Sequence, residues 1–182
     1  MLRNLLILLF GCLAFVSCKT PEARPPIQRT SGSFIDESVE RNKKIFELEK
    51  NQFLALMESN PENEYITSTN GFWYYYNKKD TISTVVPTLG DQVTFSYDLT
   101  YLNGEVLLSE EEIGIQDYIV DKTKQELISG IRDGIKLMKV GETITLFLPS
   151  YKAFGYYGIV NKLGANVPLQ SKLTLISINQ TQ

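Results

Sequence analysis

The chain has 182 residues, of which 43% are hydrophobic and 21% charged, values that suit one globular domain with an appendage. A formal net charge of −3 provides no basic surface for phosphates, so we exclude nucleic acid as a partner. The chain has no histidine, and both cysteines precede residue 19. This excludes a Ser-His-Asp triad, a Cys-His pair and a zinc site of the usual ligand types, and we expect no cofactor and no metal.

The first residues are typical of a secretory signal. Arg3 precedes an apolar run from Leu5 to Val16, which is shorter than the ~20 residues that a membrane-spanning helix needs. The tetrapeptide Phe15-Val16-Ser17-Cys18 resembles a bacterial lipobox, in which cleavage occurs before a lipidated cysteine. We therefore predict a signal peptide over residues 1–17 and a lipid anchor on Cys18. The mature chain would then contain no disulfide.

A tether and a helix follow the predicted cleavage site. Residues 18–33 are rich in proline, serine and threonine and predict a flexible tether. No acidic cluster follows Cys18, unlike the surface-export signal of Bacteroidetes lipoproteins, which favours an anchor that faces the periplasm. Residues 34–60 form the next predicted segment, with a helix that is capped by Asp36 or Ser38 and runs through Met57.

This predicted helix is amphipathic. Val39, Phe46 and Phe53 recur at seven-residue spacing, and the charged residues, Glu49 among them, occupy the remaining positions. One interpretation is that the apolar stripe packs on the domain. The other is that it forms a homodimer.

The next predicted elements are strands. Residues 71–76 form an aromatic strand, whose rings we expect to pack in the core or across strands. From Gln92 to Tyr101 apolar and polar residues alternate, and Asn103-Gly104 predicts a type I′ hairpin turn. The strand over 105–108 returns from this turn. The acidic run over 110–112 is expected to be a solvated loop.

The segment over 125–158 is the centre of the predicted fold. Its first part, residues 125–140, places five apolar residues on one face of a short helix that contains Gly130 and Gly134. A strand over 143–148, an aromatic loop and a last strand over 173–178 follow. We predict an α+β fold in which an antiparallel β-sheet wraps around one short helix. A helix and an aromatic loop that converge beside a sheet favour a hydrophobic pocket over a charged active site.

These segments carry a resemblance to a known family. GDQVTFSYDLTYLNGEVL, QELISGIRDGIKLMKVGE, SYKAFGYYG and NVPLQSKLTLISI resemble the FKBP-type peptidyl-prolyl cis-trans isomerase domain. We expect this domain over residues 65–182. Together with the lipobox, the preceding helix and the triple tyrosine, the chain is similar to the gliding-motility-associated isomerase lipoproteins (GldI type) of Bacteroidetes.

The resemblance implies rotation about X-Pro bonds of envelope client proteins, a reaction that needs an apolar pocket and no nucleophile. The backbone N–H of Ile128 would hold a substrate carbonyl. The catalytic positions that the resemblance implies are Tyr97, Leu107, Ile128 and Phe154. The implied substrate-binding positions are Tyr118, Leu127, Ile131, Val167 and Leu175.

Three positions depart from the family pattern. Leu108 stands where the family usually has aspartate, Ile131 where it has tryptophan, and Phe154 where it has tyrosine. Two hypotheses follow from these departures. The protein is either a membrane-anchored prolyl isomerase that assists the folding or assembly of envelope and motility proteins, or a catalytically weak or inactive chaperone or binding module with the same fold.

Overall fold

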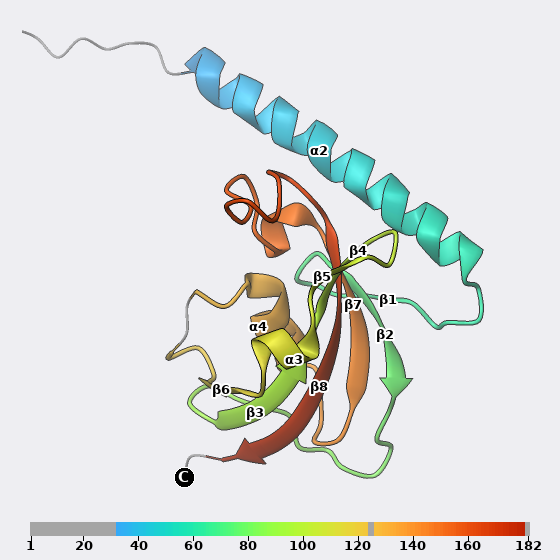
Figure 1. Cartoon of the computed structure of the whole chain (residues 1–182), viewed down its shortest axis with the longest axis vertical. Helices are drawn as coiled ribbons and strands as arrows, with labels where there is room; N and C mark the ends of the chain where they lie inside the picture. Colours follow the sequence, from blue (N-terminus) through green and yellow to red (C-terminus); the bar gives the residue numbers. More distant parts are fainter. Residues whose placement is uncertain (1–31, 124–125, 181–182) are drawn as a thin grey trace, which may run out of the picture. The chain divides into compact units, whose positions relative to one another are not determined.

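The computed structural model describes residues 32–123 and 126–180 (Figure 1). The predicted signal peptide, the lipidation site at Cys18 and nearly all of the tether lie outside the described residues. The chain divides into two compact units after Asp36, and the sheet and the helix residues that pack on it lie within the unit Glu37–Gln182. In the described residues, no helix combines the length and the apolar character that crossing a membrane requires.

Helix α2 (Gly32–Ser59) begins earlier than predicted. Asp36 and Ser38, the predicted N-caps, both lie inside the helix. It ends at Ser59, two residues beyond the predicted Met57. The Asn60 side chain donates to the Leu56 carbonyl at 2.8 Å, and Pro61 cannot continue the helix. The second half of α2 packs on the sheet, where the Phe53 ring lies 5.4 Å from Trp73 and 5.9 Å from Phe147. Val39 is 44% exposed, and a homodimer through this helix stays a prediction.

One antiparallel sheet contains the eight strands of the described residues. Its order is β1-β2-β7-β8-β3-β6, and β4 pairs with β5 and β8. The strands are β1 (Ile66–Thr67), β2 (Trp73–Lys78), β3 (Gln92–Tyr97), β4 (Leu99–Tyr101), β5 (Val106–Leu108), β6 (Gln116–Ile119), β7 (Thr143–Leu148) and β8 (Leu169–Asn179). Helix α4 (Ser129–Ile135) contacts β7 and β8 (Figure 1). The predicted α+β fold with a sheet around one short helix is confirmed.

Helix α4 is shorter than the predicted segment over 125–140, and two of its residues are glycines that allow close approach to β7. A methyl group at Gly130 would lie 2.5 Å from Leu148 Cδ2 and 3.1 Å from the Lys152 carbonyl oxygen. At Gly134 the nearest atom, Leu146 Cδ1, would be 3.0 Å away. Both glycines therefore allow α4 to lie directly on β7.

The two faces of the sheet pack against different partners. Tyr74 and Tyr76 of β2 belong to the main apolar cluster, which α4 covers. Trp73 and Tyr75 point the other way and pack with Phe53 of α2. The aromatic strand is thus core packing on both faces, as predicted.

Three local predictions are wrong. A type I′ turn requires a positive φ at both central residues. Gly104 has φ 86°, but Asn103 is not among the described residues with positive φ, so the hairpin turn is not type I′. The acidic run is not a loop but helix α3 (Glu110–Ile113), because Ser109 and Glu112 form a reciprocal capping box. The last strand, β8, begins four residues earlier than predicted and pairs with β3, β4 and β7.

Candidate active site

All nine residues predicted for the site belong to one apolar cluster, the cluster between the sheet and α4. Four of them are buried: Tyr118, Ile128, Ile131 and Leu175. Five are partly buried at its surface: Tyr97, Leu107, Leu127, Phe154 and Val167. Their roles stay predictions, but the structure brings residues from β3, β5, β6, β8, the start of α4 and two loops into one place.

The buried members lie beneath the surface of the site. Ile131 and Leu175 are fully buried, so the side chain that replaces the family tryptophan presents no surface to a client in this structure. The Tyr118 hydroxyl accepts the Asp121 N–H at 2.7 Å, which fixes the turn after β6. A client would therefore first contact the five partly buried side chains.

Tyr97 ends β3 and keeps a hydroxyl for a client. Its ring stacks on Phe95 at 5.9 Å, and burial raises the pKa of the phenol. In the part of the chain that the structure describes, no residue forms a hydrogen bond with this hydroxyl. Leu108, at the position of the family aspartate, cannot accept one. The phenol therefore remains protonated at neutral pH and can donate to a bound amide.

The second donor is the backbone N–H of Ile128, the residue that precedes α4. Its carbonyl accepts the N–H groups of Ile131 and Arg132, at 3.1 and 3.3 Å. No acceptor for the Ile128 N–H lies within residues 32–123 and 126–180. Because buried backbone donors are nearly always paired, this N–H fits the predicted role of holding a substrate carbonyl.

The loop that carries Phe154 is held from two sides. It begins with a 3₁₀ turn, η2 (Ser150–Lys152), whose Ser150 carbonyl accepts the Gly155 N–H at 2.7 Å. On the α4 side, the Lys152 ammonium lies 2.9 Å from the Asp133 carboxylate. On the other side, the carboxylate of Glu49 in α2 accepts the Ser150 N–H at 2.9 Å. This anchoring limits where the Phe154 ring can lie.

The prediction that Glu49 lies on the polar face of its helix is wrong. Glu49 is only 4% exposed and contacts the loop instead. The signal was present in the sequence, since positions 46, 49 and 53 share one helix face. A carboxylate in an apolar stripe indicates a partner across the interface.

Among the described residues, the candidate site offers apolar contacts and hydrogen-bond donors, which suit the binding and desolvation of a peptide. In residues 32–123 and 126–180, no cluster of three or more His, Cys, Asp or Glu residues is placed to hold a metal ion. Two hydrogen-bond donors beside aliphatic and aromatic side chains suit a peptide amide whose C–N bond loses double-bond character during rotation.

A family model described as FKBP-type peptidyl-prolyl cis-trans isomerase matches residues 84–176, just over half of the chain. The chain belongs to this family. Within the FKBP-type domain the match includes every predicted site residue.

Two curated relatives are named as peptidyl-prolyl cis-trans isomerases, one of them as FKBP-type. The chain is 27% identical over 143 residues to the probable FKBP-type isomerase FkpA of Neisseria meningitidis serogroup B, covering 78% of this chain and 51% of that protein. It is 31% identical over 94 residues to the isomerase Mip of Coxiella burnetii, covering 52% of this chain and 40% of that protein. The chain thus spans about half or less of the length of these relatives.

Solved structures share the fold. A peptidyl-prolyl isomerase of Pseudomonas syringae pv. tomato aligns with a TM-score of 0.59 at 18% identity, covering 76% of this chain and 96% of that one. FkpA of Escherichia coli aligns with a TM-score of 0.55 at 20% identity, covering 96% and 82%.

Proposed function

We propose that this protein is a peptidyl-prolyl cis-trans isomerase that a lipid on Cys18 anchors to a membrane. Its clients would be proline-containing proteins of the cell envelope, whose folding or assembly it assists. Membership of the FKBP-type family and the names of the two curated relatives support the activity. The observation that carries the proposal is that Tyr97, Phe154 and Ile128 meet in one apolar cluster with two unpaired donors among the described residues.

The chemistry follows from the loss of amide resonance. Rotation about a peptide bond faces a barrier of ~18–20 kcal/mol, because the planar amide has partial double-bond character. The twisted amide is less polar than the planar one, so an apolar surface built from Leu107, Phe154 and Val167 favours it relative to water. The Ile128 N–H and the Tyr97 hydroxyl would hold client carbonyls while the bond turns.

The proposed location rests on the sequence alone. The lipobox before Cys18 supports lipid anchoring, and the missing acidic cluster after it supports an anchor that faces the periplasm. Similarity to GldI-type lipoproteins supports a role in gliding motility. In a bacterial host, Cys18→Ser should release the protein from the membrane fraction and abolish incorporation of labelled palmitate. A variant that stays lipidated or membrane-bound would contradict the anchor.

One observation favours the second candidate function, a binding module with little or no turnover. Leu108 leaves the Tyr97 hydroxyl without a carboxylate partner, and fully buried Ile131 replaces a larger aromatic side chain. Turnover of a short X-Pro peptide separates the two functions. A binding module would slow the aggregation of an unfolded client and leave the isomerisation rate at its uncatalysed value.

A further inference from the structure

Four neighbouring cavities follow helix α2 from Asn42 to Asn60, with volumes of about 370, 200, 700 and 600 Å³ in that order. Each shares lining residues with the next: Glu49 and Asn166 line the first two, Gln52 and Pro168 the second and third, and Leu56 the last two. Together they form one row of adjoining cavities between α2 and the FKBP-type domain. We call it the α2 groove.

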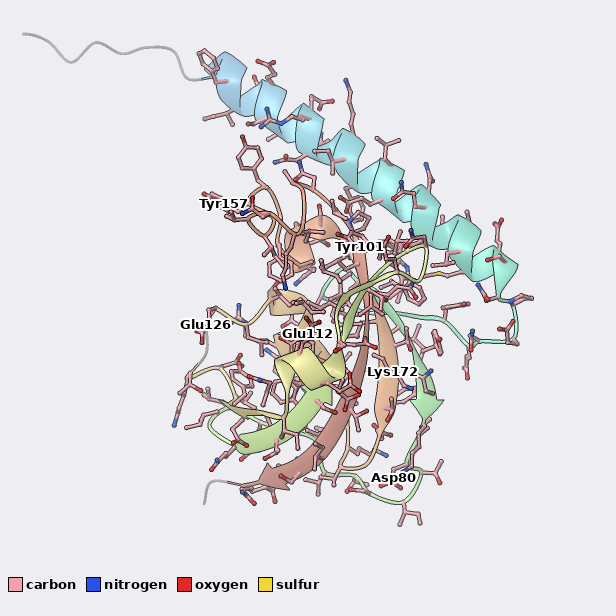
Figure 2. The ribbon with its side chains drawn as sticks, in the orientation of Figure 1. Asp80, Tyr101, Glu112, Glu126, Tyr157 and Lys172 are labelled. Atoms are coloured by element: carbon pink, nitrogen blue, oxygen red, sulfur yellow. The ribbon has the colours of Figure 1, made fainter. Side chains whose placement is uncertain are left out.

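The opposite wall of the groove consists of the loop that follows β7 and the turn between β4 and β5. At the 600 Å³ cavity, residues of β2, β7 and β8 line it as well. Tyr101, labelled in Figure 2, lines the 700 Å³ cavity together with Ala55 of α2. Its hydroxyl donates to the Lys162 carbonyl at 3.1 Å, which ties the turn to the loop. Both walls of the groove therefore consist of anchored elements.

The lining has the chemistry of a polypeptide site. Side-chain amides, which both donate and accept, recur along the groove between aliphatic and aromatic residues. They include Asn42, Gln52, Asn60, Asn103, Asn166 and Gln170. The charged residues that line these four cavities are Glu49 and Glu62, with no lysine or arginine among the lining residues. Such a surface suits an extended chain that is neutral or basic.

Glu49 adds a specific requirement. Its Oε2 accepts the Ser150 N–H, whereas its buried Oε1 has no hydrogen-bond partner among the described residues. Glu49 lines two adjoining cavities, and the rings of Phe46 and Tyr151, whose centroids are 6.0 Å apart, line the larger of them. A half-paired buried carboxylate calls for a donor, and a lysine or arginine side chain supplies both the donor and a cation for the rings.

The groove adjoins the candidate active site. The Asn166 N–H donates to the Gly155 carbonyl at 2.8 Å, and both residues line the groove. Their chain neighbours, Val167 and Phe154, belong to the apolar cluster of the site, and Val167 also lines the 700 Å³ cavity. A polypeptide that contacts Phe154 and Val167 can therefore extend into the groove.

We propose that the α2 groove binds the extended client segment that flanks the isomerised proline, and that Glu49 selects a basic side chain in that segment. This inference rests on the proposed function. From Asn42 to Ser59 the helix rises roughly 26 Å, which corresponds to about eight extended residues.

Peptide length tests the groove. Fluorescence anisotropy with the full chain would compare an X-Pro tetrapeptide with a twelve-residue peptide that has the same centre and one lysine. We expect the longer peptide to bind about tenfold more tightly, as added buried contacts and one charge-assisted hydrogen bond predict. Ala55→Trp, which places an indole ring in the 700 Å³ cavity, should remove most of this gain. Leu54→Trp is the matched control, because Leu54 is 40% exposed and lines none of the four cavities.

Charge tests the role of Glu49. A lysine peptide should bind about fivefold more tightly than its glutamine counterpart, the gain of one partly desolvated ion pair. Glu49→Gln should reduce this ratio to about one, since its amide oxygen can still accept the Ser150 N–H but carries no charge. Glu47→Gln, on the exposed face of the same helix, should keep the ratio.

Equal affinity of the long and short peptides, or an unchanged lysine ratio in Glu49→Gln, would overturn the inference. A change of oligomeric state in Ala55→Trp, with peptide affinity unaltered, would assign the groove to a second copy of the chain and overturn it as well. Turnover of the tetrapeptide is scored separately. If the long peptide binds in the groove but no peptide is isomerised, the proposed function fails and the groove stands.

Discussion

The carboxylate of Glu49 accepts the backbone N–H of Ser150 at 2.9 Å, although 101 positions separate the two residues in the chain. This hydrogen bond joins α2 to the first residue of the turn that leads to Phe154. Both partners are buried, so water contributes little to either group. Helix α2 is therefore part of the wall that positions the candidate site, and not only a spacer.

Loss of this hydrogen bond should destabilise the protein. Glu49→Ala leaves the buried Ser150 N–H without its acceptor, which we expect to lower the free energy of unfolding by about 1–3 kcal/mol. Urea denaturation measures the change. Glu47→Ala, which removes an exposed pair with Lys50, should change it by less than about 0.5 kcal/mol. Equal effects of the two substitutions would show that the Ser150 contact does not anchor the helix.

The Tyr97 hydroxyl should matter for function and not for stability. Tyr97→Phe removes a hydroxyl that has no partner among the described residues, so the urea midpoint should stay nearly unchanged. We expect kcat/KM for an X-Pro peptide to fall about tenfold, the loss of one hydrogen bond to the reacting amide. Phe95→Leu is the contrasting variant, because it removes the ring that stacks on Tyr97. We expect it to lower the free energy of unfolding more than it lowers kcat/KM. An unchanged kcat/KM in Tyr97→Phe would show that this hydroxyl does not take part in catalysis.

Asp98 should give the protein an unusual pH dependence. Burial raises the pKa of its carboxyl, and repulsion from Glu110 adds to this, against the opposing hydrogen bond from the Lys172 N–H. A folded-state pKa above the unfolded value means that the folded protein binds more protons between the two values. The contribution of Asp98 to stability therefore falls as pH rises from the unfolded pKa through the folded one.

Asp98→Asn tests this sign. The amide oxygen can still accept the Lys172 N–H, for which Asp98 Oδ1 is 2.7 Å away, but it carries no charge. We expect the variant to be more stable than the parent at pH 7, and the difference to vanish at a pH well below the unfolded carboxyl pKa. Thermal unfolding at several pH values measures it. A variant that is less stable at pH 7 would show that the charge of Asp98 is favourable.

Gly158 should be essential for the conformation of the loop beside the site. Its φ is 59°, and a methyl group there would collide with the carbonyl oxygens of Leu163 and Gly164. Gly158→Ala should lower the free energy of unfolding by about 2 kcal/mol or more, since neither oxygen can move without breaking the loop. Gly104→Ala is the matched control, with φ 86° and no atom within 4 Å of the added methyl. Equal destabilisation would attribute the effect to φ alone.

Periodicity was enough to predict the sheet and the helix on it. Alternation from Gln92 to Tyr101 and the three- and four-residue spacing around Ile131 each predict a buried apolar face, which the structure has. Ser96, on the predicted polar face, is buried as well. The boundaries were less predictable. Gly134 and the turn after Ile135 end α4 early, and β8 extends over residues whose burial depends on three partner strands.

Other features depend on contacts that are remote in the chain. The pairing of Glu49 with Ser150 and the meeting of Asn166 with Gly155 join segments that no local pattern relates. The α3 capping box is a local signal of Ser109 and Glu112. It was missed because the three consecutive acidic residues were interpreted as a solvated loop. The α2 groove could not be predicted, because it arises only where the helix lies beside the loop.

Isomerase turnover of an X-Pro tetrapeptide by the full chain, measured beside Leu108→Asp, tests the central claim most directly. The proposed function predicts that the parent accelerates cis-trans exchange, because the apolar cluster and its two donors are sufficient without the family aspartate. Exchange at the uncatalysed rate in the parent, whether or not Leu108→Asp restores it, would contradict this account. The chain would then be a binding module that keeps the FKBP-type fold.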